Sequence, residues 1–294
     1  MSATSNETAI RQVRELASSL GVDCEPVLLA DASNLVLRLA PHPIVARVAM
    51  VTSMVRAGVA WLEREVLISR FLDERGGAVT RPSRGIDPGP HERGGLVVSF
   101  WELETELPRG PDPRRAGQEL ARLHRELREL PAGVPEWGAW GEMRAVHERM
   151  HRASSFFSAA ERRRVDSAWL RAEAIVSSSR SQSASFQLVH GDAHIRNVMA
   201  TSRGELWTDW EDAFLGPIEW DLACMRSRLE LFGEEREAIE ALCSAYDEPL
   251  NADLVRELGL VRNVQVILGI ADFAERDPAR LTRLRQRIER LPEP

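Results

Sequence analysis

The chain has 294 residues, of which 44% are hydrophobic and 28% charged, a composition typical of a globular protein with one large domain or two modest ones. The formal net charge of -7 argues against a nucleic-acid partner held by a basic surface. No apolar run has membrane-spanning length, the N-terminus lacks the layout of a secretory signal, and three scattered cysteines suggest a reducing compartment. We therefore expect a cytoplasmic protein with neither a membrane nor a nucleic-acid partner. Lysine does not occur, so arginine supplies every fixed positive charge on the side chains.

The first hundred residues alternate between helix-like and strand-like patterns. An amphipathic stretch from Ala9 to Leu20 predicts a helix that ends at Gly21. Short apolar runs and a run of helical period then predict four strands and one long helix, over Pro26–Ala30, Leu35–Leu39, Ile44–Ala49, Leu96–Phe100 and, for the helix, Met54–Glu74. Together these patterns indicate a small β-sheet accompanied by helices.

From Pro111 onward, long helical patterns dominate the sequence. The predicted helices cover Arg115–Leu130, Ala139–Arg152, Ala159–Ser178, Glu234–Ala245, Asn251–Glu275 and Pro278–Arg290. We therefore expect an α+β protein with two domains, a sheet-bearing lobe over residues 1–101 and a mainly helical lobe over residues 102–294.

One segment of the second half is strand-like and rich in polar side chains. Phe186–Val189 predicts a strand that runs into His190, and Val198–Ala200 and Leu206–Thr208 predict a hairpin. Between these two strands, a three-residue loop that ends in Gly204 suits a turn with one left-handed residue.

Symmetric closure of this loop places Val198 opposite Thr208 and therefore Asn197 opposite Asp209. Opposed positions on paired strands have their Cβ atoms roughly 4.5–5.5 Å apart. An amide oxygen and a carboxylate at that spacing suit one hard cation. Asp192 lies in the loop that leads to the same end of the hairpin. The sequence therefore predicts three oxygen-bearing side chains at one site.

The spacing H-x-D-x-x-x-x-N, formed by His190, Asp192 and Asn197 and followed by Asp209, resembles the core of the aminoglycoside phosphotransferases and related small-molecule kinases. The segment from Glu211 to Ala223, EDAFLGPIEWDLA, resembles the continuation of that core. The resemblance extends over essentially the whole chain. It implies a bilobal protein-kinase-like fold, ATP and Mg²⁺ as cofactors, and a small molecule with a hydroxyl group as phosphate acceptor.

The resemblance also implies a role for each matched residue. Asp192 would accept the proton of the substrate hydroxyl, and Asn197 and Asp209 would hold Mg²⁺ against the ATP phosphates. Asp221 would brace the catalytic loop, and His190 would support the same loop.

The resemblance implies that the first lobe grips the ATP phosphates. In the family, a basic residue on the third strand pairs with a helix glutamate, and Arg47 and Glu65 occupy these positions. The loop over the phosphates contains no glycine, so the Ser33 hydroxyl and nearby amides are the candidates to cap a phosphate. The segment Phe100–Trp101–Glu102–Leu103 would be the hinge whose main-chain groups contact adenine.

Further polar residues near the predicted site are candidates for contacts with the phosphate or the acceptor: Arg196, Glu211 and Asp212. An excess of acidic residues in the second half favours a cationic acceptor of the aminoglycoside or amino-alcohol kind. Acids on helices are also common on solvated faces, so an uncharged or anionic acceptor stays open.

Two other functions remain open from the sequence. A protein of the same fold could bind a nucleotide without catalysing transfer, since the glycine-rich loop and the lysine are missing. Alternatively, His190, Asp192 and His194 form an H-x-D-x-H pattern that could bind a hydrolytic metal with Asp209. The second alternative does not account for Asn197 or for the residues that follow Asp209.

Overall fold

The computed structural model describes residues 3–31, 34–50, 58–130, 133–153, 157–274 and 278–293. It divides into two compact units, Met1–Pro111 with Val198–Glu211, and Asp112–Asn197 with Asp212–Pro294. The first unit is built on an antiparallel sheet and the second is mainly helical, so the predicted α+β, protein-kinase-like fold class is confirmed. The first unit is discontinuous in sequence, because a hairpin from the second half of the chain belongs to it.

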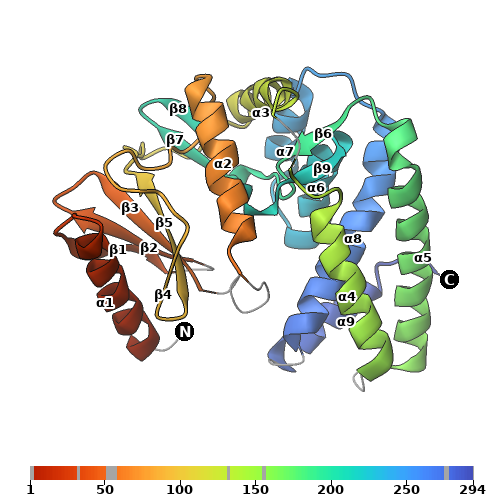
Figure 1. Cartoon of the computed structure of the whole chain (residues 1–294). Coiled ribbons are helices and arrows are strands. Elements are labelled where there is room, and N and C mark those ends of the chain that lie inside the picture. The colour runs from red at the N-terminus through yellow and green to blue at the C-terminus, as the bar shows by residue number, and fades with distance from the viewer. Residues whose placement is uncertain are drawn as a thin grey trace. The chain divides into compact units, whose positions relative to one another are not determined.

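The first unit contains a five-stranded sheet with the order β1-β2-β3-β5-β4, in which neighbouring strands are antiparallel (Figure 1). Its elements are α1 (Ala3–Ser19), β1 (Glu25–Asp31), β2 (Asn34–Ala40), β3 (Ile44–Ala49), α2 (Ala60–Glu74), β4 (His91–Arg93) and β5 (Leu96–Glu102). The strands predicted around residues 26–49 and 96–100 are therefore present. The start of the helix predicted from Met54 lies outside the described residues, and α2 begins at Ala60.

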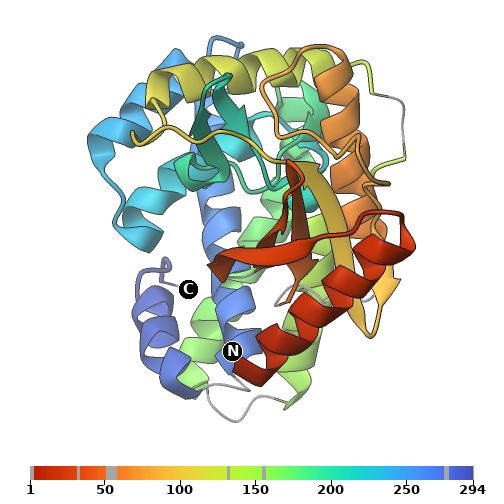
Figure 2. The same ribbon diagram turned by 90° about the vertical axis from the view of Figure 1, so that its left-hand side faces the viewer.

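The two faces of this sheet carry different helices. Side chains alternate between the faces of a strand, so Ala46 and Val48 of β3 point to one face and Val45 and Arg47 to the other. Ala46 and Val48 pack in a core cluster with residues of α1. In Figure 1, α1 lies on one side of the sheet and α2 on the other, and Figure 2 shows α1 along its strands. The alternation therefore directs Arg47 toward α2.

The hairpin of β7 (Val198–Thr201) and β8 (Gly204–Trp207) is part of the first unit. It is fixed there by main-chain hydrogen bonds, from Trp207 to Ala78 and from Thr80 back to Trp207. Arg203, in the turn, forms an ion pair with Glu104. These contacts explain why a segment distant in sequence joins the sheet-bearing unit.

The predicted register of this hairpin is wrong by one residue. Thr201 pairs directly with Gly204, so the loop has two residues and not three, and Val198 pairs with Trp207 instead of Thr208. Gly204 does adopt a positive φ of 113°. It is the first residue of β8, so the left-handed position lies within the pairing and not in the loop.

The second unit is built around α8, which makes extensive contacts with α4, α5 and α6. Its elements are α3 (Pro113–Leu127), α4 (Gly138–Ala153), α5 (Ala159–Gln182), β6 (Phe186–Val189), η2 (Ile195–Asn197), β9 (Phe214–Pro217), α6 (Glu219–Phe232), α7 (Arg236–Ala245), α8 (Ala252–Ala274), η4 (Pro278–Arg280) and α9 (Leu281–Ile288). A further single turn, η3 (Trp210–Asp212), spans the last change between the units. Figure 1 shows α4, α5 and α8 running side by side.

Two strands of the structure were not predicted from the sequence. The four-residue β9 pairs antiparallel with β6, Val189 opposite Phe214, and the three-residue β4 closes the sheet of the first unit. Both are short, and β9 contains Gly216 and Pro217, which are unfavourable in strand interiors. Among the described residues, none of the helices combines the length and apolar character needed to cross a membrane.

Candidate active site

The predicted phosphate grip forms a cluster of charged side chains in the first unit. The Nη1 atom of Arg47 lies 2.5 Å from Glu65 Oε1, and its Nη2 lies 2.6 Å from both Asp209 Oδ1 and Glu211 Oε2. The Asn34 amide of β2 lies within 2.8 Å of Arg47 Nε, so we assign its oxygen to that side. One guanidinium therefore holds groups from β2, α2 and the segment after β8. We call these residues the Arg47 cluster.

The cluster has more negative than positive charge, because one guanidinium faces three carboxylates. Glu65 is 1% exposed, and burial raises its pKa to about 7 although Arg47 acts to lower it. Burial alone would lower the pKa of Arg47, but the three carboxylates hold it above its usual range. This surplus of negative charge is what a divalent cation would neutralise.

Asp209 occupies an unusual backbone conformation in this cluster. Its φ is 69°, in the left-handed region that residues other than glycine rarely adopt. Its side chain is the most exposed of the three carboxylates, at 36%. The main-chain carbonyl of its neighbour Glu211 accepts a hydrogen bond from Arg64 Nη2 at 2.8 Å. The backbone turn thus presents the Asp209 carboxylate at the edge of the cluster.

The remaining nucleotide-site predictions in this unit find less support. Ser33 lies outside the described residues. In the predicted hinge, the main-chain amide of Phe100 donates to Pro88 and that of Leu103 to Pro43. The side chains of Phe100 and Trp101 are buried. An adenine contact at this strand end therefore needs main-chain groups other than these two amides.

In the second unit, Asp221 organises the predicted catalytic loop. Its carboxylate is fully buried and accepts hydrogen bonds from the amides of His190 at 2.8 Å and Gly191 at 2.9 Å. The His124 ring of α3 lies 2.9 Å from the same carboxylate and 2.6 Å from the hydroxyl of Tyr246. Asp221 thus braces the loop from α6, in the way that the sequence resemblance implies.

This loop requires glycine at position 191, because any side chain there would clash with neighbouring main-chain atoms. Its φ is 87°, and an added Cβ would come within 2.1 Å of the Asp212 carbonyl oxygen. His190 is fully buried, and its Nδ1 is 3.4 Å from the amide of Asp192. The loop is therefore held by its own backbone as well as by Asp221.

Asp192 is held between two basic side chains. Its Oδ1 accepts a hydrogen bond from Nη2 of Arg262, and its Oδ2 lies 3.4 Å from Nε2 of His194. Burial would raise the pKa of Asp192, but Arg262, assisted by His194 and His190, holds it well below its usual range. This depressed pKa favours the ionised form of Asp192.

Three other predicted residues belong to the second unit. Asn197 is buried, and its Nδ2 donates to the Asp192 carbonyl at 3.0 Å, so its amide oxygen is directed to accept or to ligate. Arg196 Nε lies 3.1 Å from Glu234 Oε1, so this predicted phosphate contact is paired with a carboxylate of its own unit. Asp212 is half-buried, and its charge raises the pKa of Arg262.

The sequence did not reveal Arg262 or His124. Both lie in helices that are far in sequence from their partners, Asp192 for Arg262 and Asp221 for His124, and only the packing of α3 and α8 brings them together. The buried apolar residues near Arg262 along α8, Leu258, Val261 and Val264, were a usable signal, because an arginine among such residues usually has a buried partner.

The fold is of the protein-kinase-like class, and it holds two residue groups, an arginine–carboxylate cluster beside a sheet and a braced aspartate in a helical unit. A family model described as "Phosphotransferase enzyme family" matches residues 27–258. The chain therefore belongs to the phosphotransferase enzyme family. No curated relative matches it by sequence.

Solved structures show the same fold. A choline kinase from Streptococcus pneumoniae superposes with a TM-score of 0.69 and 12% identity, covering 96% of this chain and 99% of that one. Amicoumacin kinase in complex with AMP-PNP, Ca²⁺ and Ami gives a TM-score of 0.67 and 15% identity, with 97% and 95% covered. An aminoglycoside phosphotransferase from Streptomyces rimosus gives 0.57 and 18%, with 90% and 99% covered.

The contact between Arg262 and Asp192 can be tested without an acceptor. Because Arg262 is the largest influence that lowers the pKa of Asp192, Arg262→Gln should raise that pKa into or above the ordinary aspartate range. Arg262→Lys should keep part of the depression. Carbon-13 NMR of the carboxyl groups, with the Asp192 signal identified by its loss in Asp192→Asn, would measure the change.

The sign for stability follows from the same shift. A carboxyl group whose pKa is depressed in the folded state stabilises that state at pH values above the unfolded pKa, and this stabilisation is lost as the pH falls. Arg262→Gln should therefore lower the free energy of unfolding most near neutral pH. Arg149→Gln is the matched control. Arg149 of α4 pairs with Asp272, which lies on α8 like Arg262, and not with Asp192. An Asp192 pKa that is the same in wild type and Arg262→Gln would contradict the assignment.

Proposed function

We propose that this protein transfers the γ-phosphate of ATP to a hydroxyl group of a small molecule, with Mg²⁺ as cofactor. The observation that carries the proposal is the Arg47 cluster, which joins the predicted phosphate-binding pair, Arg47 and Glu65, to the predicted metal ligand Asp209. Membership of the phosphotransferase family supports the reaction class. The free thiols of Cys24, Cys224 and Cys243 and the need for ATP favour a cytoplasmic location.

In this proposal Arg47 contacts the phosphates next to the γ-phosphate. Its planar guanidinium can form two parallel hydrogen bonds to phosphate oxygens, which the point charge of a lysine cannot do. In the free protein the same donors are bound to Asp209 and Glu211. Nucleotide binding would replace these contacts by phosphate oxygens, while Glu65 keeps Arg47 in position from α2.

The residues proposed for Mg²⁺ fit that ion. Magnesium prefers oxygen ligands, and Asp209 offers a carboxylate while Asn197 offers the amide oxygen that its own hydrogen bond leaves available. Asn197 directly precedes β7 and Asp209 follows β8 by two residues, and the antiparallel pairing brings these two chain ends to one end of the hairpin. When bound, the ion would neutralise charge on the phosphates and orient them for in-line transfer.

Asp192 then positions the acceptor. A strongly depressed pKa makes its carboxylate a weak base, so its main contribution is to orient the hydroxyl and to receive the proton late in the transfer. Arg262 fixes one carboxylate oxygen and His194 faces the other. The rotamer of the carboxylate is therefore set before an acceptor arrives.

The acidic residues behind the expectation of a cationic acceptor are less available than their number suggests. Most of the acidic residues on which it rested already have partners within their own unit. Glu211 binds Arg47, Glu248 binds Arg125 and Arg128, and Asp272 binds Arg149. The buried Glu219 accepts from Ser183 and from two main-chain amides. We therefore propose a hydroxyl acceptor without carrying the cationic class forward.

The two other functions gain no support from a specific contact. A hydrolytic metal on His190, Asp192 and His194 would meet the guanidinium of Arg262, which already binds Asp192 and would repel a cation. A protein that only binds nucleotide has no use for a carboxylate held by both Arg262 and His194. Both are outcomes that the following experiments distinguish.

The Asp192→Asn variant should keep its affinity for MgATP and lose acceptor-dependent ADP release by a factor of about 10² or more. The reason is that Asp192 orients the hydroxyl but contacts no group of the Arg47 cluster. A coupled assay with a panel of small alcohols identifies an acceptor in wild type, and the variant is then measured on it. Wild-type turnover in Asp192→Asn would rule out Asp192 as the base, and MgATP binding without turnover on any alcohol would indicate the silent alternative.

Titration calorimetry of MgATP tests the first unit. Asp209→Ala should abolish Mg²⁺-dependent binding and Asn197→Ala should weaken it. Arg47→Ala should reduce affinity strongly, by the roughly 2–5 kcal/mol typical for removing one partner of a desolvated charge pair, and Glu65→Ala should give a milder loss. Arg47→Lys should recover part of the loss, since it keeps the charge but not the fork.

The control for this series is Arg84→Ala, which removes an exposed arginine paired with Asp73 in the same unit. It should bind MgATP like wild type. If Arg47→Ala and Arg47→Lys also bind like wild type while folded, as judged by thermal unfolding, then Arg47 does not hold the phosphates.

A further inference from the structure

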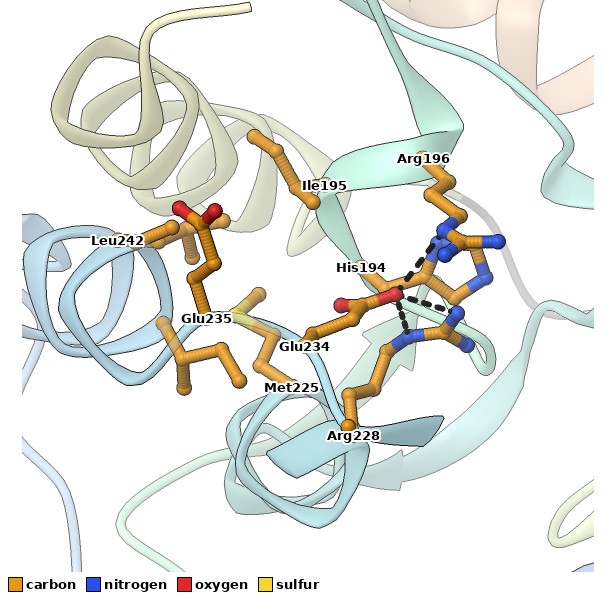
Figure 3. A pocket seen from close by; sticks show the side chains of 11 residues that line it. His194, Ile195, Arg196, Met225, Arg228, Glu234, Glu235 and Leu242 are labelled. Carbon is orange, nitrogen blue, oxygen red and sulfur yellow. Dashed lines mark hydrogen bonds and ion pairs between the residues drawn. The ribbon is translucent and has the colours of Figure 1, made fainter. Parts of the chain in front are cut away.

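A cavity of about 330 Å³ opens beside the predicted catalytic loop, within the second unit (Figure 3). Its walls come from three places: loop residues 194–196, the end of α6 with the turn after it, and the first half of α7. None of the functions assigned above uses this cavity. Its position in the chain is informative, because one wall consists of the residues that directly follow Asp192.

The charged groups of the cavity neutralise one another. Glu234 Oε1 lies 2.6 Å from Arg228 Nη2 and 3.1 Å from Arg196 Nε, and Figure 3 shows the three side chains converging. Glu235 supplies a second carboxylate at the rim. Glu234 thus faces both arginines, Glu235 points away from them, and the arginines and glutamates of the lining together carry no formal surplus of either sign. A charged ligand would find no unmatched counter-charge there.

The rest of the lining is apolar. Met225 of α6 and Ile239 and Leu242 of α7 are buried side chains that form part of the wall, and Ile195 and Ala238 complete it. Such a surface gains free energy by covering a hydrocarbon group and none by covering an ion.

The ring of His194 links the cavity to the proposed base. His194 is one of its lining residues, and Nε2 of the same ring lies 3.4 Å from Asp192 Oδ2. On the other side, Asp192 Oδ1 is bound by Arg262. Because Asp192 is already paired with Arg262, it is not an unmatched carboxylate for an amine close to the reacting hydroxyl.

We propose that this cavity binds the body of the phosphate acceptor, and that this body is an uncharged, largely apolar group that carries the reacting hydroxyl. The inference rests on the proposed phosphotransferase function. It departs from the amine-bearing ligands suggested by the acidic composition of the chain, because the acids near the cavity are matched by arginines.

A matched set of three probes tests the proposal: phenylpropanediol, which is neutral, phenylalaninol, which is cationic, and phenyllactate, which is anionic. They share one phenylpropane carbon frame and each carries a hydroxyl, and one hydroxyl position of the diol is an ammonium in phenylalaninol and a carboxylate carbon replaces the other in phenyllactate. Saturation-transfer NMR gives their relative affinities for the full-length protein without nucleotide. The neutral diol should bind at least about tenfold more tightly than either charged probe. Tighter binding of phenylalaninol would overturn the proposal.

Two variants locate the binding. Ala238→Phe fills the cavity and should weaken the diol about tenfold or more, whereas Ser244→Phe adds the same ring at an exposed position of α7 outside the lining and should not. Glu234→Gln leaves Arg196 and Arg228 unmatched and should shift the preference toward phenyllactate. Equal binding by Ala238→Phe and wild type, or an unchanged preference in Glu234→Gln, would show that the probe binds elsewhere.

Failure of this inference is separable from failure of the proposed function. Probe binding needs neither ATP nor turnover, whereas the proposed function is tested by MgATP titration and ADP release. A protein that binds MgATP and phosphorylates only amine-bearing alcohols would keep the function and refute the uncharged acceptor. A protein that binds the diol in this cavity but binds no nucleotide would keep the cavity as a site for an uncharged ligand and refute the proposed function.

Discussion

The sharing of one guanidinium, that of Arg47, among three carboxylates is the interaction on which the candidate nucleotide site depends. The chain has no lysine, so the compact point charge usual for contacting phosphate is replaced by a planar fork. The fork can bind Glu65, Asp209 and Glu211 at the same time, and it thereby joins β3, α2 and the segment after β8. The surplus of negative charge that results prepares the cluster for a divalent cation, and burial raises the pKa of Glu65 to about 7.

In the second unit, basic side chains surround a single carboxylate. There one carboxylate, that of Asp192, faces Arg262 and His194, which keeps it ionised and fixes its orientation. The loop that carries it is held by the buried Asp221 through the amides of His190 and Gly191. A transfer reaction with little covalent chemistry needs such fixed charges more than it needs a strong base. We propose that the cavity beside His194, whose arginines and glutamates balance in charge, holds the body of the acceptor next to this carboxylate.

Local pattern was sufficient to predict most of the helices and strands, because strand alternation and helical period are short-range features. The H-x-D-x-x-x-x-N spacing is equally short-range, and the site residues that it proposes stay a prediction. The direction of Arg47 follows from alternation along β3. Sequence could not supply the two-residue turn between Thr201 and Gly204, where register depends on which pairing closes the hairpin. It also could not supply Arg262, since only the packing of α8 brings that side chain to Asp192. The partners of the acidic residues were hidden for the same reason, so the expectation of a cationic acceptor could not take those ion pairs into account.

The most direct test of the account is a crystal structure of the protein with Mg²⁺ and a non-hydrolysable ATP analogue. The account predicts a metal ion bound by a carboxylate oxygen of Asp209 and the amide oxygen of Asn197 at the roughly 2.0–2.1 Å typical of magnesium. It also predicts that Arg47 has exchanged Asp209 for oxygens of the α- or β-phosphate while keeping Glu65. A nucleotide bound away from Arg47, or an Arg47 that still holds Asp209 while the metal is bound by other residues, would contradict the central claim.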